Sequence, residues 1–200
     1  MIPVTLKKRP DDFNTEVRAK GHNWLANKGI AFNTAPPKAS DLPNYWSHSN
    51  KQLWVAYGGV CAYLAIYFEW VTGASSTDHF VAKSKHAGDA YEWSNYRLSC
   101  LGPNRNKSNF ADVLDPIGLG ADTFHINFLD GSIKSNGALP SPDQQRAQAT
   151  ITRLKLDSPD NRAMRVRRFT NYLKGIVTLA HIEDESPFLH VEIVRQGLVI

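Results

Sequence analysis

The sequence predicts an α+β fold in a single domain. Ser-Pro pairs, which are typical helix starts, stand at Ser141, Ser158 and Ser186, so the C-terminal region should be mainly helical. Residues 123–129 alternate between apolar and polar and precede Asp130-Gly131, the pattern of a two-residue β-hairpin. With 200 residues and 42% hydrophobic content, the chain is long enough to bury its own core.

The region 1–60 is expected to be helical on either side of a surface loop. Apolar residues recur at near-helical spacing within Asp11–Asn27, although Gly21 should weaken that helix. Prolines scattered between residues 29 and 45 indicate an ordered loop. A second short helix is predicted over Ser49–Tyr57, ended by Gly58-Gly59.

An apolar run from Val55 to Val71 contains Glu69 and is shorter than a membrane span requires, so we expect it in the core. Its centre, VCAYLAIYFEW, fits either a central strand or a buried helix. The N-terminus has no apolar signal segment, and Cys61 and Cys100 are too few for a disulfide framework. We therefore expect a cytoplasmic protein with reduced thiols and no membrane partner.

A polar stretch from Ser76 to Ser108 concentrates acid, imidazole, amide and cation groups. We predict strands at Thr77–Val81 and Tyr96–Ser99, joined by a loop longer than ordinary hairpins use. A short helix is predicted over Asn104–Phe110, with Pro103 in its first turn. Such a group of side chains suits metal-assisted attack on a phosphodiester. The net charge of +4 is compatible with a polyanion partner.

Four segments of this stretch together resemble the HNH nuclease motif. They are Asp78-His79-Phe80, Lys83-Ser84, the segment from Trp93 to Cys100, and Asn104-Arg105-Asn106-Lys107. In that family the motif runs roughly D-H-[IF]-x-P-K-S, N-[LY]-x-x-x-C and N-x-x-K. The resemblance implies a ββα-metal core, a hairpin followed by a helix, embedded in a mainly helical domain. The surroundings are similar to small stand-alone bacterial HNH proteins, some of which act in phage defence beside an ATPase or a reverse transcriptase.

The resemblance also implies a role for each matching residue. His79 would be the base that activates water, and a neutral imidazole suits that task. Asp78 and Asn104 would bind one divalent ion through oxygen ligands, Mg²⁺ in the first place, with Mn²⁺ and Zn²⁺ as alternatives. Asn95 would brace the long loop and the base. Lys83 and Lys107 would contact substrate phosphates.

Some features depart from the family pattern. Ala82 stands where the family usually has proline, and Cys61 and Cys100 alone cannot form the structural zinc site that many members carry. Neighbouring residues of a flat strand face opposite sides, so Asp78 and His79 share one site only if the backbone bends between them. We expect His86 and His125 to be structural or on the surface.

The prediction is therefore a metal-dependent DNA endonuclease leaving a 5′-phosphate, with a regulatory partner such as an ATPase. One alternative is a catalytically silent subunit that binds nucleic acid or docks a partner, and another is an RNA-cleaving toxin of the same fold. The single domain 1–200 would comprise a helical region over residues 1–60, a ββα core of about 61–112 and a hairpin and helical region over residues 113–200. The arginines of the second Ser-Pro segment, residues 162–168, are expected on a solvated helix face.

Overall fold

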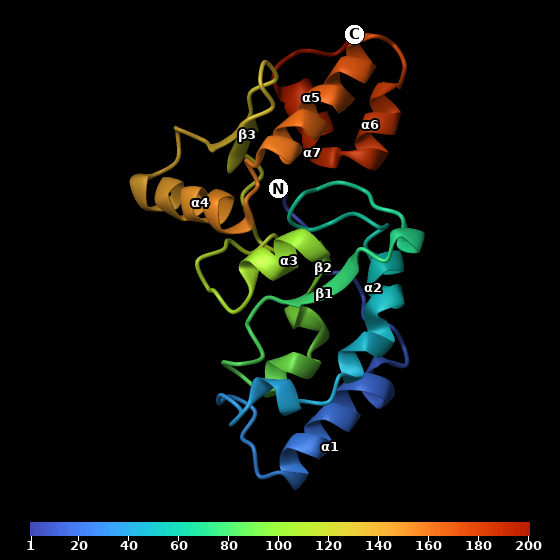
Figure 1. Cartoon of the computed structure of the whole chain (residues 1–200), viewed down its shortest axis with the longest axis vertical. Helices are drawn as coiled ribbons and strands as arrows, with labels where there is room; N and C mark the ends of the chain where they lie inside the picture. The colour runs from blue at the N-terminus through green and yellow to red at the C-terminus, as the bar shows by residue number, and fades with distance from the viewer. The chain divides into compact units, whose positions relative to one another are not determined.

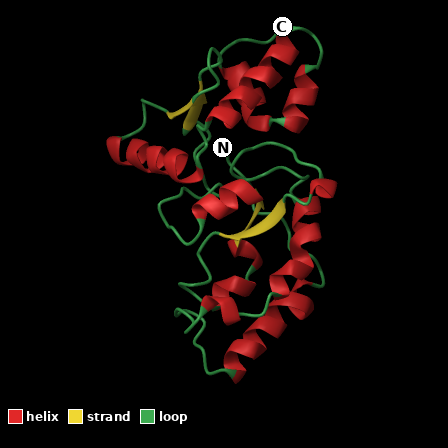
Figure 2. Cartoon of the chain, in the orientation of Figure 1, coloured by secondary structure: helices red, strands yellow, loops and turns green.

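The computed structural model describes all residues from Met1 to Ile200 and is α+β, as predicted, with seven α-helices and two two-stranded sheets (Figures 1 and 2). The chain forms two compact units. The C-terminal unit contains Met1–Thr5, Val60–Phe68 and Asp112–Ile200, and the motif unit contains Leu6–Gly59 and Glu69–Ala111. No helix combines the length and apolar character needed to cross a membrane.

The motif unit begins with a helix that confirms the prediction for Asp11–Asn27. A π-helical turn, Asn14–Ala19, continues into α1, Lys20–Asn27, and apolar side chains of this stretch are buried. The glycine at position 21 is explained by packing and not by the helix itself. A Cβ atom there would lie 2.1 Å from the ring of Tyr91, so only glycine lets α1 approach that ring.

Helix α2, Asn50–Ala56, confirms the second predicted helix. It ends before Gly58 and Gly59, whose φ angles of 59° and 70° lie in the left-handed region that glycine adopts without strain. The loop before α2 contains short 3₁₀ turns at Ala39–Asp41 and Tyr45–Ser49. Three further 3₁₀ turns lie at Trp70–Thr72, Gly88–Tyr91 and Trp93–Asn95.

The two predicted strands of the polar stretch form an antiparallel pair. Strand β1, Ser75–His79, pairs with β2, Tyr96–Cys100, so that Asp78 lies opposite Arg97 and His79 opposite Tyr96. Strand β1 begins and ends two residues earlier than predicted. Beyond His79 the chain bends, and the side chain of Asn95 takes over hydrogen bonding to the backbone of Val81. Regular strand pairing therefore stops at His79.

Helix α3, Leu101–Lys107, follows β2 directly and packs on both strands. It begins three residues before the predicted start, so Pro103 still lies in its first turn, where a missing N–H costs little. It ends at Ser108, which has a φ of 49°. The order strand, strand, helix is thus present in the motif unit (Figure 1).

The apolar run around Cys61 forms neither of the two predicted elements. Within the C-terminal unit it makes a tight turn, in which Cys61 N–H donates to Ile66 O and Ala65 N–H donates to Cys61 O. Ala65 adopts a φ of 50°, and the N–H of Tyr67 donates to Glu185 O. The run is neither strand nor helix, because its backbone groups form hydrogen bonds within the turn and to a distant segment. They do not form the repeating hydrogen bonds of a sheet or a helix.

The second sheet of the chain is the hairpin of the C-terminal unit. Strand β3, Phe124–Ile126, pairs with β4, Ile133–Ser135, as the alternating pattern predicts. The predicted two-residue turn is wrong, because six residues from 127 to 132 connect the strands. In this loop Gly131, at a φ of 72°, faces the carbonyl oxygen of Arg162, which an added Cβ would approach to 2.3 Å.

The four helices of the C-terminal unit are α4, Ser141–Leu154; α5, Pro159–Leu173; α6, Leu179–Glu185; and α7, Pro187–Arg195. All three Ser-Pro helices are present, and α6 was not predicted. Of the three Ser-Pro serines, only Ser158 caps its helix, accepting a hydrogen bond from Asn161 N–H. Ser141 does not cap α4, since Pro140 is the N-cap residue of that helix.

The prediction of a solvated arginine face on α5 is wrong for two of its members. The guanidinium of Arg165 is buried and donates to the carbonyls of Gly131 and Leu156, and burial lowers its pKa to about 10. Arg168 donates to Glu185 O and contacts Ser186 Oγ. Arg167 stays exposed. These contacts join α5 to the loops around it.

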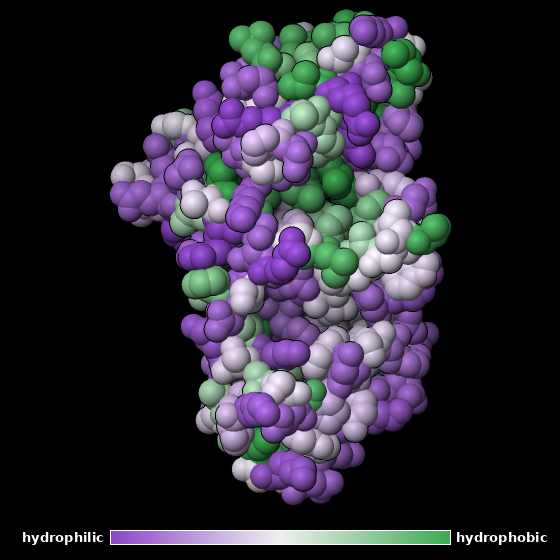
Figure 3. All heavy atoms as spheres, viewed as in Figure 1, coloured by the Kyte–Doolittle hydropathy of each residue, from purple (hydrophilic) through white to green (hydrophobic).

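Hydrophilic and hydrophobic atoms alternate over much of the visible surface (Figure 3). Hydrophobic residues, drawn in green, gather at the end of the C-terminal unit where the chain ends at Ile200. Exposed apolar side chains of this unit include Leu173, Ile176 and Ile200, and the N–H of Ile200 donates to the hydroxyl of Tyr172.

Candidate active site

The residues that the sequence singled out lie on or beside β1, β2 and α3 of the motif unit. Asp78 and His79 end β1, Asn95 immediately precedes β2, and Asn104 and Lys107 lie on α3. Lys83 follows β1 in the long loop. Because α3 packs on both strands, its inward face meets β1.

Asp78 and Lys107 form an ion pair inside this assembly. The Nζ of Lys107 lies 3.1 Å from Asp78 Oδ1, and the two side chains are 2% and 1% exposed, respectively, for the aspartate and the lysine. The same ammonium donates to the carbonyl oxygen of His79 at 2.8 Å. A buried ammonium requires such acceptors, because desolvation without them is costly. Lys107, expected at a substrate phosphate, therefore serves as the counter-ion of Asp78 and docks α3 onto β1.

The imidazole of His79 has a defined proton arrangement. Its Nε2 lies 3.1 Å from the carbonyl oxygen of Ala90. A carbonyl can only accept, so Nε2 carries the proton and Nδ1 retains its lone pair. Burial lowers the pKa of His79 to about 4, a shift that the Ala90 contact opposes and the nearby Lys83 and Lys107 ammonium groups reinforce. The ring is thus neutral at pH 7, with Nδ1 as an acceptor.

Aromatic rings hold that imidazole in place. The ring of Trp46 contacts it edge-on with centroids 4.9 Å apart, and Tyr96 does so at 5.2 Å. Tyr96 also donates its hydroxyl hydrogen to Ala90 O, the acceptor used by His79. Trp46 is half-buried and contacts His79. No local sequence signal links it to the motif, because it lies on a separate turn before α2.

Asn95 connects both sides of the long loop. Its side-chain oxygen accepts from Val81 N–H at 2.7 Å, and its amide nitrogen donates to the carbonyls of Val81 and Asp89 at 2.9 Å each. Its own carbonyl accepts from Phe80 N–H. Ala90, which follows Asp89, supplies the carbonyl that orients His79. The 7% exposed Asn95 therefore has the contacts that a bracing role requires.

Asp78 and His79 direct their side chains to different partners. The Asp78 carboxylate meets Lys107 of α3, whereas the His79 ring meets Trp46 and Tyr96. Regular pairing with β2 extends through His79, and the backbone bend lies at the following residues, 80 and 81. The bend that a shared site for Asp78 and His79 requires is therefore not between these two residues but after both.

The donor types at Asp78 and Asn104 fit a hard divalent ion. Asn104 is half-buried on α3, three residues before Lys107 and so on the same face of the helix. A carboxylate and an amide carbonyl are suitable oxygen ligands for Mg²⁺, which keeps several waters. No cluster of three or more His, Cys, Asp or Glu side chains forms a metal site of another kind. The Lys107 ammonium, however, competes with any metal for Asp78.

Lys83 is half-buried and lies near the His79 imidazole, whose pKa its charge lowers. Its Nζ lies 4.2 Å from the centre of the Trp46 ring, and burial lowers its pKa. Two other histidines have local partners: His86 is exposed and pairs with Asp89, and in the C-terminal unit His125 pairs with Asp122. Both histidines match the structural or surface role that we expected.

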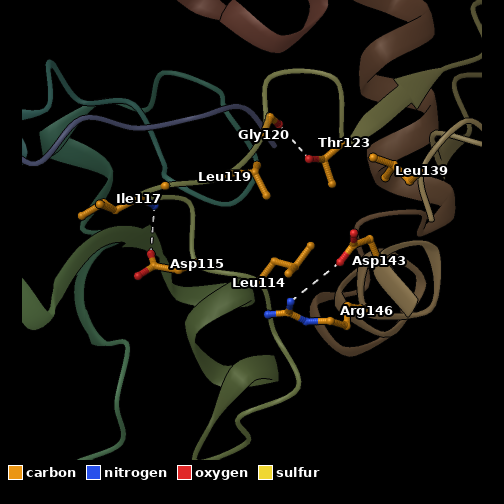
Figure 4. Close-up of a pocket in the computed structure, with 10 residues that line it drawn as sticks. Leu114, Asp115, Ile117, Leu119, Gly120, Thr123, Leu139, Asp143 and Arg146 are labelled. Carbon is orange, nitrogen blue, oxygen red and sulfur yellow. Dashed lines mark hydrogen bonds and ion pairs between the residues drawn. The ribbon is translucent and has the colours of Figure 1, made fainter. Parts of the chain in front are cut away.

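A cavity of about 360 Å³ lies within the C-terminal unit (Figure 4). Leu114, Ile117 and Leu139 supply much of its apolar lining, and Asp143 and Arg146 of α4 form an ion pair across 3.9 Å. None of the motif residues lines this cavity.

Comparison with known proteins adds no family to this geometry. No protein-family model matches the chain, and no curated protein sequence is significantly similar to it.

Proposed function

We propose that the protein is a metal-dependent endonuclease of the HNH type that hydrolyses phosphodiester bonds of DNA. The observation that carries the proposal is the His79–Ala90 hydrogen bond. It fixes the imidazole with Nε2 protonated and Nδ1 available, which is the state that a general base needs. Asn95 supports this arrangement through its contacts to Val81 and Asp89.

In this proposal each residue has one task. His79 accepts a proton at Nδ1 from the attacking water. Lys83 contributes positive charge for the phosphate, which stabilises the charge that develops during attack. Asp78 and Asn104 would hold the divalent ion, which when bound neutralises charge on the phosphate and the leaving oxygen. The expected product carries a 5′-phosphate, as the resemblance implies.

A plasmid-nicking assay tests the proposal. Purified protein should convert supercoiled plasmid to the nicked form with Mg²⁺ or Mn²⁺, and His79→Ala should abolish this conversion. His86→Ala is the matched control, since that imidazole is exposed and pairs with Asp89. Cleavage that survives both His79→Ala and EDTA would exclude the mechanism. Offering tRNA beside plasmid distinguishes a DNA-cutting enzyme from an RNA-cutting toxin.

One observation favours a second function, a silent nucleic-acid-binding or partner-docking subunit. The Asp78 carboxylate already has a buried counter-ion in Lys107, so the fold does not depend on a metal there. A silent module should bind DNA without cleaving it. Thermal stabilisation by Mg²⁺ that Asp78→Asn removes would favour the enzyme, and its absence, together with no nicking, would favour the silent module.

A further inference from the structure

A tryptophan outside the motif contacts two of its residues at once. Trp46 belongs to the 3₁₀ turn Tyr45–Ser49 before α2. The ammonium of Lys83 lies over its ring at 4.2 Å, and the ring meets His79 edge-on at 4.9 Å with an interplanar angle of 89°. Tyr91 supports it with ring centroids 6.0 Å apart. The rigid ring of Trp46 thus contacts both the Lys83 ammonium and the His79 imidazole.

The Lys83 ammonium has no anionic partner within the chain. No carboxylate forms an ion pair with it, whereas Lys107 is paired with Asp78. The side chain is half-buried, so part of its hydration is lost, and the aromatic face replaces only some of that loss. A positive charge held in one position without a counter-ion is well suited to an incoming anion.

Flexible lysines normally contact phosphates as mobile point charges, and ordering such a side chain costs conformational entropy. A ring that already holds the ammonium removes part of that cost before the substrate arrives. The contact with His79 ties this fixed charge to the candidate base, so that a phosphate bound at Lys83 lies beside the imidazole.

We propose that Trp46 is a positioning residue, which holds the Lys83 ammonium for a non-bridging phosphate oxygen of the DNA backbone next to His79. This inference rests on the proposed function and adds to it the substrate group bound at Lys83 and the residue that places Lys83.

The salt dependence of DNA binding tests it, because each phosphate contact changes the slope of log K against log[salt] by about 0.9. We would measure fluorescence anisotropy of a labelled DNA duplex in EDTA, so that nothing is cleaved, at about 50 to 200 mM salt. Lys83→Met and Trp46→Leu should each reduce the slope by about 0.9. The double variant should show no greater reduction, and Lys83→Arg, which keeps charge and stacking, should retain the wild-type slope.

A matched pair within the chain provides the control. Lys28 lies over the ring of Trp24 at 5.9 Å on a different region of the motif unit. Trp24→Leu and Lys28→Met should leave the slope unchanged, since neither residue contacts His79. A general loss of stability would affect both tryptophan variants alike, whereas loss of one phosphate contact affects only the Trp46 pair.

Nuclear magnetic resonance keeps the test decisive if Trp46→Leu does not fold. In the wild type the Lys83 methylene resonances should be shifted by the ring current of Trp46 and stay shifted when DNA saturates the protein. An unchanged slope in Lys83→Met or in folded Trp46→Leu overturns the inference, as does a return of these resonances to ordinary values on DNA binding. Absence of salt-dependent DNA binding in the wild type would overturn the proposed function as well, so the two failures are distinguishable.

Discussion

Lys107 of α3 and Asp78 of β1 form a buried ion pair with 3.1 Å between Nζ and Oδ1. The lysine donates in addition to His79 O, so one ammonium binds two neighbouring residues of the strand. This contact fixes the helix on the hairpin and neutralises a proposed metal ligand. Removing either partner should therefore have consequences for both stability and metal binding.

The variant Lys107→Met should be destabilised by about 3–5 kcal/mol, because it leaves the Asp78 charge buried without a counter-ion. If Asp78 and Asn104 bind Mg²⁺, the ion should restore much of this loss, since it can replace the missing ammonium. Chemical unfolding in EDTA and in excess Mg²⁺ measures both effects. The double variant Asp78→Asn with Lys107→Met is the control and should be less destabilised and insensitive to Mg²⁺. Equal stability of Lys107→Met and wild type in EDTA would contradict the structural role of the pair.

The lowered pKa of the His79 imidazole predicts a pH dependence of stability. Its folded pKa of about 4 lies below the unfolded value near 6.5, so the unfolded state binds more protons between these limits. The free energy of unfolding should therefore fall as the pH is lowered from 6.5 to 4, by up to about 3 kcal/mol. Urea unfolding in EDTA across this range measures the slope. His79→Gln should lose this contribution, and His86→Gln should keep it; identical slopes for wild type and His79→Gln would refute the assignment.

Gly131 gives a prediction for the hairpin of the C-terminal unit. Alanine there would require a left-handed φ and would also bring Cβ to 2.3 Å from Arg162 O. Gly175, with a φ of 66° and open space around it, isolates the conformational cost. Gly131→Ala should therefore be less stable than Gly175→Ala by about 1–3 kcal/mol, since the backbone of α5 must shift. Thermal unfolding of both variants decides this, and equal losses would mean that the loop relaxes freely.

Local patterns predicted much of the secondary structure, because helices and hairpins depend on signals within a few residues. The α3 helix around Gly102-Pro103 and the strands β3 and β4 are of this kind. Non-local contacts account for the misses. In the run around Cys61, the N–H of Tyr67 donates to the carbonyl oxygen of the distant Glu185. Gly21 lets α1 approach the ring of Tyr91. A local sequence pattern contains neither contact.

The same division holds for the candidate site. Its residues could be singled out as a group by the motif that they resemble, but their pairings depend on how α3 and the turn before α2 pack. Lys107 could be expected at a phosphate until packing buried it against Asp78. The role of Trp46 depends on its contact with His79 and Lys83, which arises only in the folded motif unit.

Replacing Asn95 tests whether the hydrogen bonds that brace the long loop also keep His79 oriented for the proposed reaction. Asn95→Ala would leave the Val81 N–H and two loop carbonyls without their partners, at a cost of about 2–4 kcal/mol for the buried groups together. Because the loop also carries the Ala90 carbonyl, His79 should lose its orientation, and nicking should fall at temperatures where the variant is still folded. Asn109→Ala, an exposed position just beyond α3, is the control and should change neither quantity. Chemical unfolding and the plasmid assay, run on the same preparations, measure the two effects. Full nicking activity in a folded but destabilised Asn95→Ala would show that the loop holds His79 without this brace.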